Sequence, residues 1–267
     1  PHAPYGGQED CMEEDYALYK DMSYNDLYVR PNADTTLVKA PSARYYFANV
    51  TAVDREFGRI LDEVKRLGLD RNTIVVFTSD HGETMCSHGT LDPKNSIWTE
   101  SFNVPMLIRY PERVRPHVDT TLLSSVDIMP TLLSMAGLRD AVPSTAEGRD
   151  LSPLLMETGE GCDVPSSVLY LRNLNGEKAS DGTVTGFFPE ARGIRTASHT
   201  MEISITRDGR LREAVIYDDR NDPYQMHPID RHDAPELFET LLAELSAKLR
   251  EADDVWHRNG IIENLKF

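Results

Sequence analysis

Apolar positions between residues 42 and 68 recur at spacings of three and four, which is the period of an α-helix. The recurring positions are Phe47, Val50, Val53, Phe57, Ile60, Leu61, Val64 and Leu67. Ser42 is placed to cap the beginning of this helix, and Gly68 is placed to end it. The pattern therefore predicts one long helix with an apolar face that packs against the rest of the fold.

Two short runs, "TIVVF" (73–77) and "VPMLIRY" (104–110), are rich in apolar residues. Each run suits a strand that is covered on both faces. A second helix is predicted over 124–137, with Pro130 near its first turn and Gly137 past its end. A helix, a short turn and a buried strand form the repeating unit of an α/β fold. We expect residues 1–160 to form a mostly parallel sheet flanked by helices.

After about residue 165, apolar and polar residues alternate in short segments separated by turn residues. The segments are "SSVLYLRN", "ARGIRTASH", "TMEISITRDGRL" and "EAVIYDD". A last helix is predicted to begin near Asp233. Its apolar face consists of Leu237, Phe238, Leu241, Leu242, Leu245 and Leu249. Residues 161–267 are therefore predicted to form a small subdomain, in which an antiparallel sheet packs against one helix.

Charge and cysteine content restrict the classes of partner. The 267 residues include 28 Lys and Arg against 44 Asp and Glu, which gives a net charge of −16. Nucleic-acid binding needs a basic face, so we expect no nucleic-acid partner. No apolar stretch approaches the roughly 20 residues that cross a bilayer, so we expect no membrane partner. Three distant cysteines, Cys11, Cys86 and Cys162, make a disulfide framework or a zinc knuckle unexpected.

Candidate chemistry follows the first predicted strand, where Asp80, His81 and Gly82 come in succession. Ligands of open α/β sheets bind at the carboxyl ends of the strands. A carboxylate and an imidazole at such an end can both bind a divalent cation, and Gly82 allows the backbone to turn sharply. In the alternative, Asp80 caps a turn and His81 lies on the surface. His88 and Lys94 follow in a loop, and a cation beside a metal would suit an anion with several oxygens.

The segment "NTIVVFTSDHGETMCSHGTLDPKNSIWTESFNVPMLIRYP" (72–111) resembles the second half of the sulfatase catalytic domain. Further segments in family order are "PHAPY", "YYFANVTAVDREFGRILDEVKRLGL", "SSVDIMPTLLSMAG", "GRDLSPLL" and "IYDDRNDPYQMHPI". Several ordered matches are more specific than any one of them. The resemblance implies an alkaline-phosphatase-like α/β fold and the hydrolysis of sulfuric esters.

The resemblance also implies roles for individual residues. Asp80 and His81 match the second pair of metal ligands in the family, and Lys94 matches the lysine that binds the sulfate and supports the leaving oxygen. His2 matches the N-terminal histidine of the site, and His88, beside the pocket, is assigned to substrate binding. The expected cofactor is Ca²⁺, with Mg²⁺, Mn²⁺ and Zn²⁺ as alternatives. The expected substrate is a small-molecule or carbohydrate sulfate ester.

The sequence also departs from the family pattern. Cys86 stands where glycine is common, and Trp98 stands where tyrosine is common. The Cys-x-Pro-Ser-Arg segment, whose cysteine becomes formylglycine, and the first two metal-binding aspartates of the family are not in these 267 residues. The chain therefore resembles the C-terminal portion of a sulfatase. Its expected partner is the remaining N-terminal half of the catalytic domain, and the isolated chain is expected to be inactive.

Two alternatives share the same residues. A phosphonate or phosphodiester hydrolase of the same superfamily would keep Asp80, His81 and Lys94 but differ in its upstream nucleophile. A non-catalytic, sulfatase-like fragment would only bind a partner or an anion. Among sulfate esters, the sequence leaves sugar sulfates, aryl sulfates and choline sulfate open.

Overall fold

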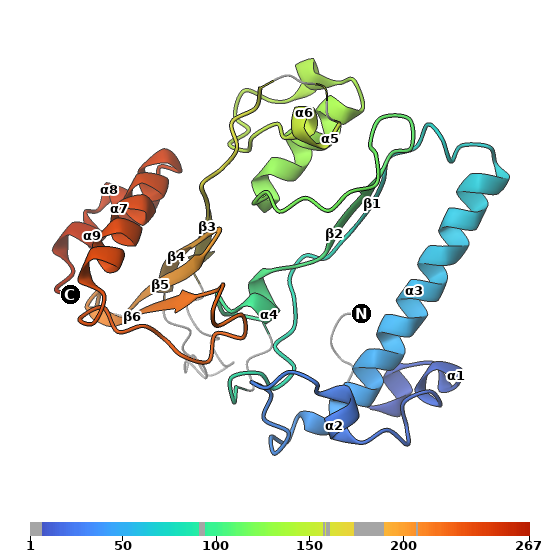
Figure 1. Ribbon diagram of the computed structural model, residues 1–267, viewed down its shortest axis with the longest axis horizontal. Coiled ribbons are helices and arrows are strands. Elements are labelled where there is room, and N and C mark those ends of the chain that lie inside the picture. Colours follow the sequence, from blue (N-terminus) through green and yellow to red (C-terminus); the bar gives the residue numbers. More distant parts are fainter. Residues whose placement is uncertain (1–6, 91–93, 157, 159–160, 174–189, 207) are drawn as a thin grey trace, which may run out of the picture. The chain divides into compact units, whose positions relative to one another are not determined.

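A computed structural model describes residues 7–90, 94–156, 158, 161–173, 190–206 and 208–267 (Figure 1). The chain divides into two compact units, residues 1–113 and 114–267. This division falls well before residue 160. The assignment of residues 1–160 to the catalytic domain and of 161–267 to a subdomain stays a prediction.

The first unit is built around one long helix. The helical segments that precede its strands are the 3₁₀ turns Gln8–Asp10 and Ala40–Ser42 and the α-helices α1 (Glu13–Tyr16), α2 (Tyr24–Leu27) and α3 (Ala43–Arg66). Helix α3 confirms the helix predicted from the apolar spacing, and Gly68 follows its end with a φ of +70°. Ser42 is the N-cap residue, as predicted, but its side chain makes no capping hydrogen bond; its hydroxyl donates to the Lys39 carbonyl oxygen at 2.7 Å.

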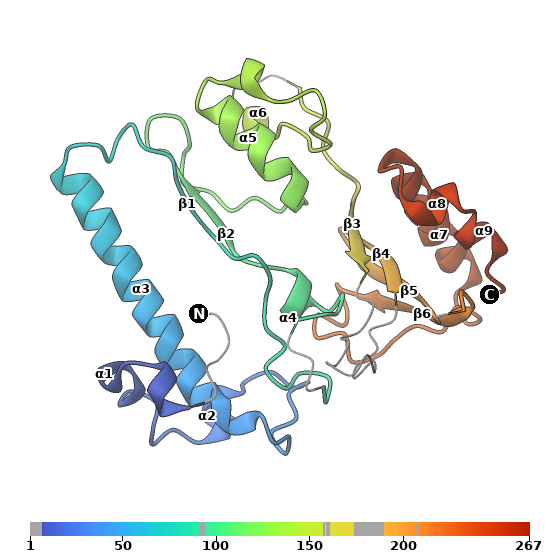
Figure 2. The same ribbon diagram turned by 180° about the vertical axis from the view of Figure 1, so that it is seen from behind.

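Helix α3 contacts elements from both sides of it in the sequence. Near its middle, the Arg55 guanidinium pairs with the buried Asp15 of α1 (Nη2–Oδ2, 3.0 Å), and α1 lies beside α3 in both views (Figures 1 and 2). Further along α3, the Phe57 ring packs against the Phe77 ring, with 4.9 Å between the ring centroids. Much of the predicted apolar face remains exposed in this chain, and Ile60 is 58% exposed.

Strands β1 (Val75–Thr78) and β2 (Met106–Arg109) confirm both predicted apolar strands of the first unit. They pair antiparallel in register Val75↔Arg109 to Thr78↔Met106, and the described residues contain no parallel pair. The expectation of a parallel arrangement for these strands was therefore wrong. The connection between them carries only the four-residue helix α4 (Thr99–Phe102), whereas parallel strands usually need a crossover helix.

The second unit begins with a small helical region. It contains the 3₁₀ turns Ser125–Asp127 and Arg139–Ala141 and the helices α5 (Ile128–Met135) and α6 (Ser152–Leu155), so the predicted helix over 124–137 is present. Buried Asp127 accepts hydrogen bonds from the backbone N–H groups of Ser124 (2.8 Å) and Arg149 (2.7 Å). Gly148 approaches this turn so closely that a Cβ would lie 1.9 Å from the Val126 carbonyl oxygen. This contact explains why only glycine fits there.

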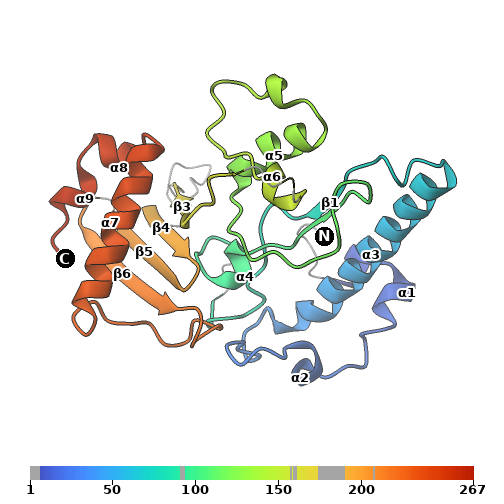
Figure 3. The ribbon, with the colours of Figure 1, turned by 45° about the horizontal axis from the view of Figure 1, so that its top comes forward.

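The predicted antiparallel sheet is confirmed in the rest of the second unit. Its strands are β3 (Ser167–Arg172), β4 (Glu190–Thr196), β5 (His199–Ile205) and β6 (Leu211–Asp218), and they pair in this order. Helices α7 (Pro235–Glu251), α8 (Val255–Arg258) and α9 (Ile261–Asn264) follow, and α7 crosses one face of the sheet (Figure 3). Their shared core consists of Ile194, Met201, Ile203, Ile205, Ile216, Phe238, Leu241, Leu245, Leu249, Trp256 and Ile262.

A fully buried arginine, Arg192, lies at one side of this core. Its guanidinium forms a two-point ion pair with Asp254 (Nε–Oδ1, 3.0 Å; Nη2–Oδ2, 3.1 Å) and lies over the Trp256 ring. The remaining donors reach the carbonyl oxygens of Ala191 and Arg172 and the carboxylate of Glu190. Four hydrogen bonds and a second ion pair therefore surround the guanidinium, as a buried cation requires.

None of the helices in the described part of the chain is long and apolar enough to span a membrane. Cys11, Cys86 and Cys162 form no disulfide, and Cys86 is fully buried.

Candidate active site

The end of β1 is held against α4 by a close backbone contact at Gly82. The Gly82 N–H donates to the Ser101 carbonyl oxygen at 2.8 Å. A Cβ at position 82 would lie 1.9 Å from the Glu100 carbonyl oxygen, so only glycine fits between the two segments. This contact fixes the direction in which the chain leaves β1, and it thereby places the two preceding residues.

Asp80, His81 and Lys94, three of the residues singled out from the sequence, come together at this point. The His81 Nε2 atom lies 3.3 Å from Asp80 Oδ2 and 3.1 Å from Lys94 Nζ. The Asp80 side chain is largely exposed, and the His81 side chain is about one third exposed. Asp80 does not cap a helix; its Oδ1 accepts the His81 N–H at 3.0 Å. A carboxylate, an imidazole and an ammonium group thus meet at the carboxyl end of a strand.

Local contacts determine which nitrogen of His81 is available. His81 Nδ1 lies 2.8 Å from the Gly82 carbonyl oxygen, which can only accept, so Nδ1 carries a proton. The Nε2 atom then faces Asp80 and Lys94. The pKa of Asp80 is lowered: burial raises it, but the neighbouring His81 and hydrogen bonds from the His81 N–H and the Ser79 hydroxyl together outweigh burial.

Asp80 and His81 fit one half of a divalent-metal site by the chemistry of their donors. An anionic oxygen and an imidazole nitrogen with its other nitrogen hydrogen-bonded are both typical metal ligands. Within the described ranges, no group of three or more His, Cys, Asp or Glu side chains is placed to hold a metal. Any metal bound here would therefore need ligands beyond these two.

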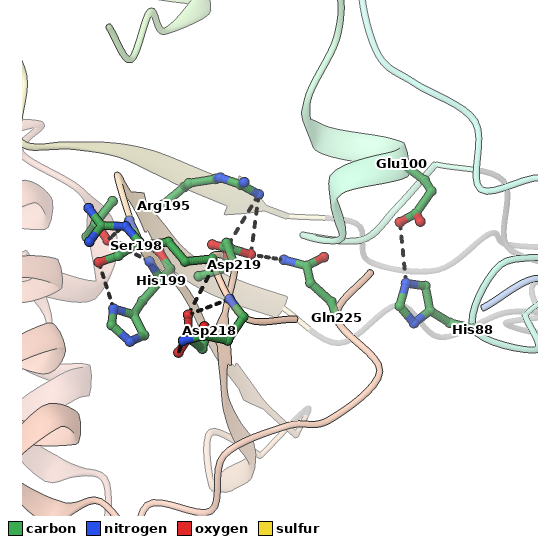
Figure 4. A network of polar contacts seen from close by, with 12 residues as sticks. His88, Glu100, Arg195, Ser198, His199, Asp218, Asp219 and Gln225 are labelled. Atoms are coloured by element: carbon green, nitrogen blue, oxygen red, sulfur yellow. Dashed lines mark hydrogen bonds and ion pairs between the residues drawn. The ribbon is translucent and has the colours of Figure 1, made fainter. Parts of the chain in front are cut away.

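His88 belongs to a second cluster, and its side chain is largely buried. Its Nε2 is 3.3 Å from Glu100 Oε2, and Figure 4 shows the two side chains facing each other. The His88 ring stacks on Trp98, with 4.0 Å between centroids. Glu100 also accepts from Asn32 Nδ2 (2.8 Å) and pairs with Arg30 Nη1 (2.9 Å). The His88 side chain is only 9% exposed, so it is poorly placed for direct contact with a ligand.

Glu100 remains ionised in this cluster. Burial raises its pKa, but hydrogen bonds from His88 and Asn32 outweigh burial and lower the pKa to about 2. A carboxylate that accepts several hydrogen bonds favours its charged form even where water is excluded. Glu100 therefore carries a full negative charge at neutral pH and holds its partners by charge-assisted contacts.

The backbone of the loop that carries His88 is strained. Met85, Cys86 and His88 have φ angles of +43°, +66° and +58°, values that non-glycine residues rarely adopt. Two backbone hydrogen bonds to residues 32–34 hold this conformation. Asp34 N donates to the Cys86 carbonyl (3.0 Å), and His88 N donates to the Asn32 carbonyl (2.9 Å). Strained backbone of this kind concentrates at functional sites.

The sequence predicted part of this arrangement. His2 lies outside the described residues, so its place in the site remains a prediction. Glu100, Asn32 and Ser101 were not singled out, because nothing in their spacing indicates that α4 would contact the end of β1. A buried acid in a four-residue helix gives no periodic signal that could have identified it.

The predicted Tyr-Asp…Asn-Asp-Pro turn in the second unit is a folded turn built on two acids. Asp218 accepts from the backbone N–H groups of Arg220 and Asn221, both at 3.1 Å. Asp219 accepts from Gln225 Nε2 at 2.8 Å and pairs with Arg195 at 3.6 Å (Figure 4). These contacts account for both aspartates as structural residues of the turn.

Two protein-family models match this chain. The sulfatase family model matches residues 1–138, and the model described as N-sulphoglucosamine sulphohydrolase, C-terminal, matches residues 86–254. The endo-4-O-sulfatase of Bacteroides thetaiotaomicron is 47% identical over 265 residues, which cover 99% of this chain and 52% of that protein. The chain spans about half the length of the curated relatives it matches.

Two solved structures show the same relationship. One, from work on the metabolism of multiple glycosaminoglycans by Bacteroides thetaiotaomicron, matches with a TM-score of 0.92 at 47% identity, over 99% of this chain and 55% of that chain. Another, solved in complex with its substrate D-glucosamine-2-N,6-O-disulfate, matches with a TM-score of 0.65 at 26% identity, over 90% and 50%. The chain therefore belongs to the sulfatase family and has a mixed α/β fold of the alkaline-phosphatase-like class.

Proposed function

We propose that this chain is the C-terminal part of a sulfatase that hydrolyses a sulfuric ester of a carbohydrate. The observation that carries the proposal is the convergence of three side chains at the end of β1, where Asp80 Oδ2 and Lys94 Nζ lie 3.3 Å and 3.1 Å from His81 Nε2. In this proposal, residues 1–160 complete the catalytic domain and residues 161–267 form a subdomain.

Lys94 is proposed as the catalytic cation. Cleavage of a sulfate ester places negative charge on the oxygens around sulfur and on the leaving oxygen. An ammonium group fixed at this point stabilises that charge, and it does so most strongly where little water is present. The contact with His81 supports this role, because it directs Lys94 Nζ toward the end of the strand.

Asp80 and His81 are proposed to hold a divalent cation, most simply Ca²⁺, with Mg²⁺, Mn²⁺ and Zn²⁺ as alternatives. When bound, such a cation supplies positive charge that polarises the sulfate oxygens. Asp80 contributes an anionic oxygen at the pH of the cell, because its pKa is lowered. His81 contributes Nε2, because its Nδ1 is already held by the Gly82 carbonyl.

The remaining parts of the site are proposed to come from elsewhere in the protein. A formylglycine nucleophile and further metal ligands are expected in an N-terminal half that completes the catalytic domain. His2 is proposed to manage protons at the nucleophile or the leaving group. The isolated chain is therefore expected to show no turnover. The predicted substrate role of His88 would have to act through its neighbours, because its side chain is buried.

Sulfated saccharides are the proposed substrate class. The names of two similar proteins support this choice, since one is an endo-4-O-sulfatase and another was solved with a glucosamine disulfate. The test is an assay of the whole protein with sulfated oligosaccharides, an aryl sulfate, and a phosphonate and a phosphodiester of the same aryl alcohol. Faster turnover of the phosphorus esters would favour a phosphonate or phosphodiester hydrolase. No turnover of any ester would favour the non-catalytic alternative.

A further inference from the structure

The short helix α4 contributes one buried serine, Ser101, that contacts both parts of the candidate site. Its carbonyl oxygen accepts the Gly82 N–H at 2.8 Å. Its hydroxyl donates a hydrogen bond to the backbone carbonyl of Lys94. Ser101 is only 3% exposed, so solvent water hardly competes for either contact.

These two contacts restrain the backbone next to His81 and at Lys94, the two residues whose side chains meet. Gly82 directly follows His81, and its carbonyl oxygen orients the His81 ring through Nδ1 at 2.8 Å. The Lys94 carbonyl belongs to the residue whose Nζ lies 3.1 Å from His81 Nε2. Ser101 thus binds the backbone beside His81, through Gly82, and the backbone of Lys94.

We infer that Ser101 is a positioning residue that fixes the backbone of Lys94 beside the end of β1; this inference rests on the proposed function. Lysine has a long side chain with many rotamers, so its ammonium group is placed reliably only if its backbone is fixed. A displacement of about 1 Å at a reacting group can lower the rate by about 10²-fold. The hydrogen bond from the Ser101 hydroxyl restricts movement of the Lys94 backbone, which would otherwise displace the ammonium group.

The test is a double-mutant cycle in the whole protein, with Ser101→Ala, Lys94→Ala and the double variant assayed on the sulfate ester that the wild type hydrolyses fastest. Ser101→Ala should lower kcat by about 10-fold to 10²-fold, with KM little changed. In the Lys94→Ala background the same change should cause no further loss. A residue that acts only through Lys94 has nothing left to position once the ammonium group is gone.

Ser42 provides a matched control. It is also buried, and its hydroxyl also donates to a lysine carbonyl, that of Lys39, at 2.7 Å. Ser42→Ala should leave kcat unchanged. A second measurement is the calcium dissociation constant from calorimetry, which Ser101→Ala should leave unchanged, because the contact with Gly82 involves only backbone atoms and persists.

Several results would overturn the inference: normal kcat in Ser101→Ala, an equal loss in both backgrounds, or a parallel loss of calcium affinity. If circular dichroism showed that Ser101→Ala does not fold, Ser101→Cys would replace it in the cycle, since a thiol fills similar space but is a weak donor. A wild-type protein that hydrolyses no sulfate ester would overturn the proposed function, and this inference with it. An active wild type with an additive cycle would overturn the inference alone.

Discussion

Two buried carboxylates, Glu100 in the first unit and Asp254 in the second, pair with basic side chains in different surroundings. Asp254 meets Arg192 beside the apolar core of the sheet, and it also caps α8 through the Trp256 N–H at 2.8 Å. Glu100 lies in a four-residue helix beneath a strained loop, where its partners are polar. Pairing of a carboxylate with a basic side chain thus stabilises the core of the sheet at Asp254, and it organises the candidate site at Glu100.

This contrast separates stability from catalysis. Substitutions around Arg192 should lower the free energy of unfolding and leave the chemistry intact. Substitutions around the end of β1 should change turnover, with smaller effects on folding. The following changes test that separation in the whole protein.

The largest expected effect is on stability. Arg192→Ala should lower the free energy of unfolding by about 3–5 kcal/mol, because it leaves the Asp254 carboxylate buried without its cation. Urea denaturation measures the loss. Arg212→Ala, at an exposed position of β6, should change stability by less than about 0.5 kcal/mol. A similar small change for Arg192→Ala would show that Asp254 finds water or another partner.

Turnover should depend most on Lys94. Lys94→Ala should lower kcat on a sulfate ester by about 10²–10³-fold, because it removes a donor directed at charge that develops in the transition state. Its melting temperature should change little. The exposed Lys20 is the control, and Lys20→Ala should leave both quantities unchanged. Near-normal kcat in Lys94→Ala would contradict the catalytic role of Lys94 and indicate an ordinary surface lysine.

Acid should weaken the Glu100 cluster. The pKa of Glu100 in the folded protein is about 2, below its ordinary value of 4.5, so folding favours the carboxylate. The resulting stabilisation is complete above about pH 4.5 and is lost as the pH falls toward about 2, and it is on the order of 3 kcal/mol. Glu100→Gln should therefore be less stable than the wild type at pH 6, and the difference should shrink at pH 3. The exposed Glu147, replaced by Gln, should show no such difference at either pH.

The smallest effect distinguishes two glycines. Gly82→Ala places a Cβ 1.9 Å from the Glu100 carbonyl oxygen, and such overpacking costs about 1–3 kcal/mol of stability. It should also lower kcat, since the end of β1 must move. At Gly58, inside α3, an added Cβ would meet open space, and Gly58→Ala should raise stability by about 0.5–1 kcal/mol. Equal effects of the two substitutions would contradict the close contact at Gly82.

The elements with regular periodicity could be predicted from the sequence. Helix α3 and strands β3 to β6 followed directly from apolar spacing, since the burial of one face imposes a period of 3.6 or 2. The antiparallel direction of β1 and β2 could not be predicted, because a buried strand reads the same in either direction. The predicted beginning of the last helix near Asp233 was close, but α7 begins at Pro235.

The site was predictable only where it coincides with a strand end. Asp80 and His81 were singled out because position at the carboxyl end of a strand carries chemical meaning, and Lys94 because it follows in the loop at that edge. Glu100 and Ser101 were missed, because their roles arise from contacts with residues 82, 88 and 94 that only the folded chain reveals. Such contacts between residues distant in the sequence cannot be predicted from the local sequence pattern.

The β1–β2 pair has a consequence for handling this chain on its own. In the described part of the chain neither strand has a second partner, so each leaves a row of backbone donors and acceptors on one edge. Open edges of β-branched, uncharged strands such as "TIVVF" are templates for self-association. The net charge of −16 at pH 7 opposes this by mutual repulsion between molecules. Colloidal stability should therefore be best at neutral pH and low salt, and should fall as acid neutralises the carboxylates.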